Sequence, residues 1–239
     1  MPQHIRMVLV EPSHPGNIGA AARAMRTMCL DTLVLVRPAR FPHADARARA
    51  SGALDVLETA RVTDSLDDAL HGCTLVAGTS ARLRALGPPV LTPRDCAARL
   101  RQAPATADVA LLFGRERTGL TNEEVARCHF LIQIPANPDY SSLNLAAAVQ
   151  VLAYELFLAR DVAAPLTTDG EPSPATEEEM QGLYSHLESA AVASGFLDPQ
   201  QPKYLMRRLR HLFNRAQPDQ REINILRGLL NALQQGKRG

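Results

Sequence analysis

Five short apolar runs recur along the first part of the chain and are separated by longer stretches with helical signals. The runs cover residues 5–10, 32–36, 75–78, 109–113 and 130–134. Strands that alternate with helices predict an α/β fold, in which a mainly parallel sheet is covered by helices on both faces. A ligand of such a sheet binds beyond the carboxyl ends of the strands. The functional residues are therefore expected in the loops that follow these runs.

Several local signals mark where the helices begin. Thr121 opens the sequence T-N-E-E, in which a threonine and Glu124 are spaced as a capping box. Further helix starts are expected at residues 63–64 and 92–93. Beyond Ser142 an apolar stripe at helical spacing predicts a long helix, and the stripe consists of Leu145, Val149, Leu152 and Leu156.

The chain is expected to divide into a domain of residues 1–163, a linker of residues 164–175 and a helical extension of residues 176–239. The linker is rich in Pro, Gly, Ser and Thr. In the extension, the last helix is expected to present one apolar face, formed by Ile223, Leu226, Leu230 and Leu233.

The charge of the extension changes sign along the chain. No Lys or Arg occurs from Asp161 to Pro202, whereas nine basic and two acidic residues follow from Lys203 onward. A basic block of this kind is either a solvated helix face or a surface that binds phosphates. The charge pattern alone leaves both interpretations open.

Composition excludes several classes of protein. No apolar segment is long enough to span a bilayer, and the N-terminal residues enter the first apolar run without the pattern of a signal peptide. The four cysteines lie far apart and form no C-x-x-C pair, which favours reduced, mostly buried thiols over a disulfide framework or a zinc site. We therefore expect a cytoplasmic protein with no membrane partner and no metal requirement.

The first candidate segment, GNIGAAARAM (residues 16–25), follows the first apolar run. A glycine-rich turn that opens a helix can bind an anion through free backbone N–H groups. The spacing is G-x-x-G rather than G-x-G-x-x-G, and the second run ends at Arg37 rather than at an acidic residue. Both features argue against a nicotinamide-dependent oxidoreductase. A purely structural interpretation also exists, with Asn17 as a helix N-cap and Arg23 as an exposed helical arginine.

The second and third candidate segments are FGRERTGL (residues 113–120) and the loop and helix of residues 135–156. Gly114 would let a ligand approach the backbone, and Gly119 would permit a tight turn. Glu116 and its two neighbouring arginines can equally form a surface ion-pair cluster. In the third segment Ser141, Ser142 and Asn144 can simply cap the helix. Each segment is ambiguous when taken alone.

Taken together, the three segments resemble the signatures of the SpoU branch of the SPOUT RNA methyltransferases. These signatures are N-x-x-x-x-x-R from Asn17 to Arg23, FG-x-E-x-x-GL from Phe113 to Leu120, and IP-x-x-P followed by SLN-x-A from Ile134 to Ala146. The sequences RERTGL and NPDYSSLNLA are similar to those of the TrmJ-type tRNA (cytidine/uridine-2′-O)-methyltransferases. The resemblance covers roughly residues 1–160, and the joint pattern is highly specific.

The resemblance implies a catalytic domain with a C-terminal trefoil knot, assembled as a homodimer whose cofactor pockets lie against the subunit interface. It implies S-adenosyl-L-methionine as cofactor, bound by Thr79, Ser80, Ala81, Gly114, Ile134, Ser141, Ser142, Leu143 and Asn144. The implied catalytic residues are Arg23, Asn17, Glu116 and Ser142. The implied partner is tRNA, with the ribose of nucleotide 32 in the anticodon loop as the expected target.

The residues expected to bind tRNA are Arg23 and five of the basic residues of the extension, namely Lys203, Arg207, Arg208, Arg210 and Arg215. A guanidinium is almost never deprotonated in proteins, so Arg23 is expected to grip a phosphate and stabilise the developing alkoxide. The proton would then leave through water or Ser142. Two alternatives stay open: a ribosomal RNA 2′-O-methyltransferase with the same motifs, and a catalytically silent RNA-binding protein.

Overall fold

The computed structural model describes residues 4–81, 87–160 and 174–235. Its strands are β1 (His4–Val10), β2 (Leu33–Val36), β3 (Arg61–Thr63), β4 (Leu75–Thr79), β5 (Val90–Leu91), β6 (Asp108–Phe113) and β7 (Phe130–Ile132). Its helices are α1 (Pro15–Thr27), α2 (Ala44–Ala50), α3 (Leu54–Glu58), α4 (Leu66–Leu70), α5 (Pro93–Gln102), α6 (Asn122–Ala126), α7 (Leu145–Arg160), α8 (Glu177–Ala193), α9 (Leu205–Ala216) and α10 (Gln220–Gln235).

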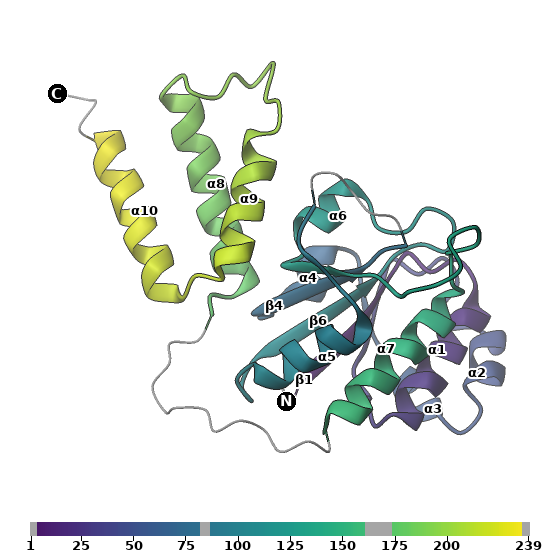
Figure 1. Cartoon of the computed structure of the whole chain (residues 1–239). Coiled ribbons are helices and arrows are strands. Elements are labelled where there is room, and N and C mark those ends of the chain that lie inside the picture. Colours follow the sequence, from purple (N-terminus) through teal and green to yellow (C-terminus); the bar gives the residue numbers. More distant parts are fainter. Residues whose placement is uncertain (1–3, 82–86, 161–173, 236–239) are drawn as a thin grey trace.

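The strands form one parallel sheet in the order β3-β2-β1-β6-β4-β7-β5 (Figure 1). This confirms the predicted α/β fold. The last predicted run was two residues too long, because β7 ends at Ile132. Two edge strands, β3 and β5, were not predicted. They have three and two residues, too few for a period-two pattern to be read in the sequence.

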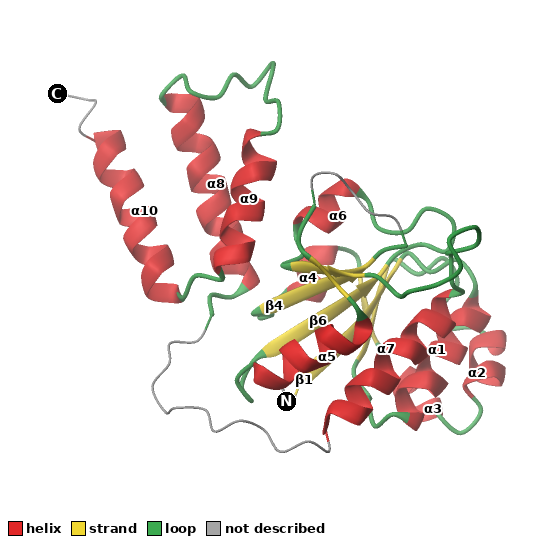
Figure 2. Cartoon of the chain, viewed as in Figure 1, coloured by secondary structure: helices red, strands yellow, loops and turns green. Residues whose placement is uncertain are grey.

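Helices cover both faces of the sheet, as predicted (Figure 2). Along β1, Ile5, Met7 and Leu9 belong to one core cluster, whereas Val8 and Val10 belong to the other. Successive side chains of a strand point to opposite faces, so a strand buried on both sides is apolar throughout. The four predicted stripe residues of α7 are all buried in the first cluster: Leu145, Val149, Leu152 and Leu156.

Most of the predicted helix starts are confirmed. Thr121 and Glu124 form the capping box of α6, and Thr92 caps α5. The start expected at residues 63–64 was wrong. Thr63 still belongs to β3, where its carbonyl accepts from the Arg37 N–H at 2.9 Å, and Ser65 is the N-cap of α4.

Helices α8, α9 and α10 follow as an extension with a small core of its own, which includes Leu183, Tyr184 and Ile223. Leu226 and Leu230 of the predicted apolar face pack against this core, whereas Leu233, farther along the same face, is 62% exposed. Residues 164–173 of the expected linker lie outside the described residues.

The extension is attached near the amino ends of β4 and β7. The Glu177 N–H donates to the Cys73 carbonyl at 2.8 Å. Asn214 Nδ2 donates to the carbonyls of Ala126 and Cys128 at 3.2 and 3.1 Å. Because parallel strands all point the same way, this attachment lies at the opposite edge of the sheet from the expected ligand site (Figure 1). Within the described residues, no helix has the length and apolar character needed to cross a membrane.

Candidate functional site

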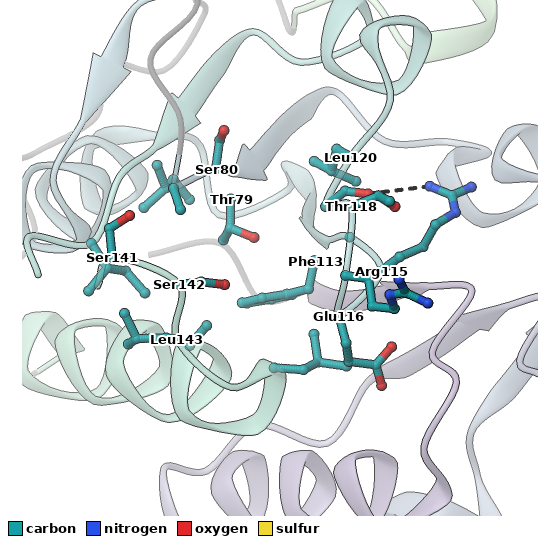
Figure 3. A pocket seen from close by; sticks show the side chains of 18 of the residues that line it. Thr79, Ser80, Phe113, Arg115, Glu116, Thr118, Leu120, Ser141, Ser142 and Leu143 are labelled. Carbon is teal, nitrogen blue, oxygen red and sulfur yellow. Dashed lines mark hydrogen bonds between the residues drawn. The ribbon is translucent and has the colours of Figure 1, made fainter. Parts of the chain in front are cut away.

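The loops that follow β4, β6 and β7 enclose a cavity of about 380 Å³. These three strands are neighbours in the sheet, so their carboxyl ends bring residues 79–81, 113–120 and 134–143 together. Figure 3 shows the Phe113 side chain directed toward the segment of Ser141, Ser142 and Leu143, with Thr79 and Ser80 above them in the view. The structure thus brings together at this cavity Thr79, Ser80, Ala81, Gly114, Glu116, Ile134, Ser141, Ser142 and Leu143.

The second loop depends on its two glycines. A Cβ on Gly114 would lie 2.2 Å from the carbonyl carbon of Gly119, so only glycine fits where the loop folds back on itself. Gly119 has φ +69°, and its N–H closes a turn on the Arg115 carbonyl at 2.9 Å. The tight turn expected at Gly119 is present. At Gly114 the backbone that approaches closely belongs to the chain itself.

Arg115 holds this loop in place. Its guanidinium donates to both carboxylate oxygens of Glu124 at 3.0 Å and to Glu11 at 2.6 Å. The hydrogen bonds from Arg115 and Arg37 lower the pKa of Glu11 to about 2, and the same pairing raises the pKa of Arg115. Arg115 is therefore ion-paired, but its partners are Glu11 and Glu124 rather than the neighbouring Glu116 that the sequence suggested.

Glu116 has a different environment and turns toward the N-terminal segment (Figure 3). Its carboxylate accepts from Ser13 N–H and Oγ at 3.0 Å, from His14 N–H at 3.2 Å and from Asn17 Nδ2 at 3.1 Å. Burial alone would raise the pKa of Glu116, but these hydrogen bonds outweigh burial and lower it. Glu116 is therefore an ionised acceptor that fixes the start of α1, and a poor candidate for a proton acceptor.

A chain of hydrogen bonds joins the three motifs. Asn17 bonds to Glu116, and Asn144 Nδ2 donates to Asn17 Oδ1 at 3.0 Å. Asn144 Oδ1 also accepts from the Ala146 N–H at 2.9 Å, so its expected role as a cap of α7 is present. The N-cap role considered for Asn17 was wrong, because the residue that caps α1 is His14.

Asn144 faces a second cavity, of about 660 Å³, between the start of α1 and α2. Its two neighbours Leu143 and Leu145 line the first cavity. The segment of Leu143 to Leu145 therefore separates the two cavities. The other residues expected to bind the cofactor line the first cavity, whereas Asn144 lines the second. Among the described residues, no group of three or more His, Cys, Asp or Glu side chains is arranged to hold a metal ion.

Comparison with known proteins decides the family. Residues 4–154 match the model of the SpoU rRNA Methylase family. The chain belongs to the SpoU rRNA methylase family. Residues 178–239 also match the model of the tRNA methyltransferase TrmJ C-terminal domain, which places the chain among the TrmJ-type members of the SpoU family.

Individual relatives agree with this assignment. The tRNA (cytidine/uridine/adenosine-2′-O-)-methyltransferase TrmJ of Pseudomonas aeruginosa is 51% identical, over 100% of this chain and 97% of that protein. The crystal structure of TrmJ from Z. mobilis has a TM-score of 0.84 at 37% identity and covers 98% of this chain and 99% of that one. A structure described as giving insight into 2-OH methylation of C/U34 on tRNA has a TM-score of 0.53 at 28% identity. It covers 67% of this chain and 98% of that one.

Arg23, the arginine of the first SpoU motif, lines neither cavity. It is exposed on α1, six residues beyond Asn17, which is about 9 Å along the helix. Sequence reasoning also missed cavity residues that lie inside the motifs themselves. These residues, which were not singled out although their neighbours were, are Arg117, Thr118, Asp139 and Tyr140.

The basic residues of the TrmJ-type extension fall into two groups. Lys203, Arg208 and Arg215 are exposed, whereas Arg207 is half-buried. Arg210 packs inside the extension, with its guanidinium 4.4 Å from the ring centre of Tyr184. It also donates to Gln181 Oε1 at 3.1 Å, and burial lowers its pKa. Arg210, which was expected to bind RNA, therefore already contacts Tyr184 and Gln181 of the extension.

Proposed function

We propose that this chain is an S-adenosylmethionine-dependent methyltransferase that methylates a ribose 2′-hydroxyl of tRNA. The observation that carries the proposal is that the second and third SpoU motifs line one cavity, while the hydrogen bonds from Glu116 through Asn17 to Asn144 join the first motif to them. The TrmJ-type extension and the 51% identical TrmJ relative support tRNA rather than ribosomal RNA as the substrate.

The first cavity suits S-adenosylmethionine in size and chemistry. Pockets for small ligands and cofactors have volumes of about 300–1,000 Å³ and combine apolar walls with a few polar groups. Ile132, Ile134 and Leu145 provide the apolar wall for the adenine, and the hydroxyls and backbone of the loops provide hydrogen bonds. S-adenosylmethionine supplies a methyl group on a positively charged sulfur, which is already an activated electrophile. The protein has to position this methyl group and manage one proton.

Arg23 is proposed to grip a phosphate of the RNA and to stabilise the developing alkoxide of the ribose. Ser142 is exposed and lines the cavity, so the proton of the 2′-hydroxyl can leave through Ser142 or water. Asn17 and Glu116 act as positioning residues, because they fix the start of the helix that carries Arg23.

The proposed enzyme is a homodimer. Arg23 does not line the cavity of its own chain, so a second copy is needed to bring an Arg23 to the cofactor. Helix α7 offers a surface for this contact, because Tyr154 and Leu158 are 47% and 42% exposed and share one helical face with Val151. No metal is assigned to the reaction. Since tRNA is its substrate, we place the enzyme in the cytoplasm.

We also propose that the catalytic domain carries the trefoil knot of SPOUT proteins. β7 lies between β4 and β5, which both precede it in the sequence. Residues that follow β7 line the same cavity as residues that follow β4 and β6, and α7 then packs against α1 and α5. These observations support the proposal of a knot, which is rare among protein chains.

The exposed basic residues of the extension, Lys203, Arg208 and Arg215, are proposed to bind tRNA phosphates together with Arg207, whereas Arg210 is better explained as a packing residue. The target is proposed to be the ribose of nucleotide 32. The similar structure that covers 67% of this chain concerns 2-OH methylation of C/U34 on tRNA, so positions 32 and 34 must be distinguished by experiment.

The experiment is to incubate the protein with unmodified tRNA, or with ribosomal RNA, and S-adenosylmethionine labelled in its methyl group. A 2′-O-methyl group blocks alkaline cleavage at its own nucleotide, so a labelled, protected dinucleotide is expected from tRNA, and its sequence locates the target. A labelled mononucleotide would indicate base methylation. Label only in ribosomal RNA would favour that substrate instead, and RNA binding without label would favour a catalytically silent protein.

A further inference from the structure

The second cavity has no role in the proposed chemistry, although it adjoins the cofactor cavity. It lies between the first turn of α1, the loop before α2, and α2 itself. Among its lining residues are Gly16, Asn17, Arg40, Asp45, Arg49 and Asn144.

The charge of this cavity favours an anion. Arg40 and Arg49 are both exposed, and neither forms a hydrogen bond or ion pair with any other described residue. Nearby arginines are paired instead: Arg37 with Glu11, and Arg47 with Glu58. The one carboxylate of the cavity, Asp45, lies 3.6 Å from His43 Nδ1, so two guanidinium groups face a single negative charge. Guanidinium groups that lack a protein partner are well suited to bind a phosphate.

The backbone that carries the two arginines is held in place by its surroundings. α1 and α2 pack in backbone contact, because a Cβ on Gly19 would lie 2.0 Å from the Ala46 carbonyl oxygen. The stem of Arg49 runs beside the start of α1, with its Cγ 3.6 Å from the position of a Cβ on Gly16. Next to Arg40, the Ala39 N–H donates to the Pro12 carbonyl at 3.1 Å. The backbone of the site is therefore organised before a ligand arrives.

The two neighbouring cavities suit a ribose and a neighbouring phosphate of one RNA strand. Asn144 lines the second cavity, while the residues before and after it line the first. A ribose in RNA has a phosphate on each side, so a strand whose ribose reaches the first cavity carries a phosphate to within one nucleotide of it. We propose that the second cavity binds a backbone phosphate next to the methylated nucleotide through Arg40 and Arg49. This inference rests on the proposed function.

The test uses the full chain with a fluorescently labelled anticodon stem-loop RNA and S-adenosylhomocysteine, and measures RNA affinity as a function of salt. For the double variant Arg40→Ala/Arg49→Ala, we expect RNA binding to weaken roughly tenfold. The slope of log affinity against log salt should also fall by about 0.7 for the phosphate that is no longer neutralised. Cofactor affinity, measured by calorimetry, should not change, because neither arginine lines the first cavity.

Two further variants sharpen this test. Arg47→Ala removes an arginine of the same helix that pairs with Glu58 and lies outside the cavity, so RNA affinity should stay at the wild-type value. Asp45→Asn removes the negative charge of the cavity while keeping the side-chain shape, so it should strengthen RNA binding. A double variant that binds RNA like Arg47→Ala would overturn the proposal, as would a double variant whose oligomeric state changes, because the cavity would then be an interface between copies.

A second arm identifies the phosphate. Single phosphates of the stem-loop are replaced by neutral methylphosphonates, and each RNA is titrated against wild type and the double variant. One linkage next to the target nucleotide should weaken wild-type binding and leave the double variant unaffected. Equal losses in both proteins at every linkage would refute the inference while methylation by the wild type still stands. A wild type that neither binds nor methylates tRNA would refute the proposed function as well.

Discussion

The polar residues assigned to the proposed reaction divide into those already bonded by the protein and those left for substrate. Glu116 is held by the Ser13, His14 and Asn17 donors, and Arg115 is held by two carboxylates. Arg23 is exposed and is not used by the fold of its own chain in this way. A residue whose loss leaves the fold intact is the better candidate for a role in the reaction.

Arg23→Ala should therefore lower kcat by at least about a hundredfold, because the alkoxide and phosphate would lose their charged partner. The midpoint of thermal unfolding and the affinity for S-adenosylmethionine should stay close to wild type. Single-turnover methylation and calorimetric titration measure the two effects. If cofactor affinity falls as far as activity does, Arg23 has a structural role instead.

His129 makes the stability of the catalytic domain depend on pH. It is buried where β7 begins, and its Nδ1 accepts from the Val76 N–H at 3.1 Å. Burial lowers the pKa of His129 to about 4. As the pH falls from about 6.5 toward 4, the unfolded chain takes up a proton that the folded chain does not. The free energy of unfolding should fall by up to about 3 kcal/mol across this range.

His129→Asn is the matching control, because an asparagine oxygen can accept the same hydrogen bond but does not titrate. Its free energy of unfolding should lack the His129 contribution between pH 6.5 and 4. Glu11 titrates in a separate range, since its lowered pKa of about 2 gives stability that is lost only as the pH falls below about 4.5. Denaturant unfolding at several pH values measures the contribution of His129. Identical dependence of the free energy of unfolding on pH for wild type and His129→Asn would contradict this prediction.

At the scale of elements, a few buried polar contacts attach the helical extension to the sheet. Asn214 is 4% exposed, and it donates from α9 to the carbonyls of Ala126, at the end of α6, and Cys128, between α6 and β7. Arg127, on the same segment, pairs with Glu177 of α8. Burial opposes the charge of Arg127, but its carboxylate partners outweigh burial and raise its pKa. These contacts fix α8 and α9 relative to the sheet.

Asn214→Ala should destabilise this attachment by about 1–3 kcal/mol, because it leaves two buried carbonyls without their donor. Calorimetry should then resolve a separate, lower unfolding transition for the extension. Asn231→Ala is the matched control, since Asn231 is exposed on α10. A single unfolding transition, unchanged from wild type, would show that Asn214 does not hold the two parts together.

Two arginines of α9 provide a second prediction at this scale. Arg208 is exposed, so Arg208→Ala should weaken tRNA binding and reduce its salt slope by about 0.7–0.9. Arg210 stacks on Tyr184, so Arg210→Ala should lower stability by about 1 kcal/mol and leave the salt slope unchanged. Binding titrations at several salt concentrations and thermal unfolding distinguish the two. The opposite result would reverse the roles assigned to these side chains.

At the scale of the whole molecule, the first cavity and the extension lie at opposite edges of the sheet. The cavity follows the carboxyl ends of β4 and β7, whereas Cys73, Ala126 and Cys128, which bind the extension, precede these strands. A tRNA that contacts both must span at least the length of a strand, which is about 17 Å for the five residues of β4. The extension is therefore expected to influence tRNA affinity more than the chemical step.

The proposed dimer can be tested by mixing two inactive variants. Arg23→Ala keeps its cofactor cavity, while Gly114→Ala keeps Arg23 but loses the close approach of the loop to Gly119. If Arg23 serves the cavity of the other copy, a heterodimer has one complete site and should recover about half of the wild-type activity. Activity is measured after co-expression and purification with two affinity tags. No recovery in a verified heterodimer would mean that Arg23 acts within its own chain.

The sequence by itself determined the parallel sheet, the loops that line the first cavity and the family. Strands buried on both faces have an apolar pattern that is visible over five or six residues. Each motif consists of residues that stand close together in the sequence, so it can be recognised without the structure. Only the tertiary structure showed that Asn17, Glu116 and Asn144 share hydrogen bonds, that Arg40 and Arg49 face one cavity, and that Arg210 is packed. Asn17 and Asn144 stand 127 positions apart, and which distant side chains meet depends on how the whole sheet and its helices pack, which no local pattern encodes.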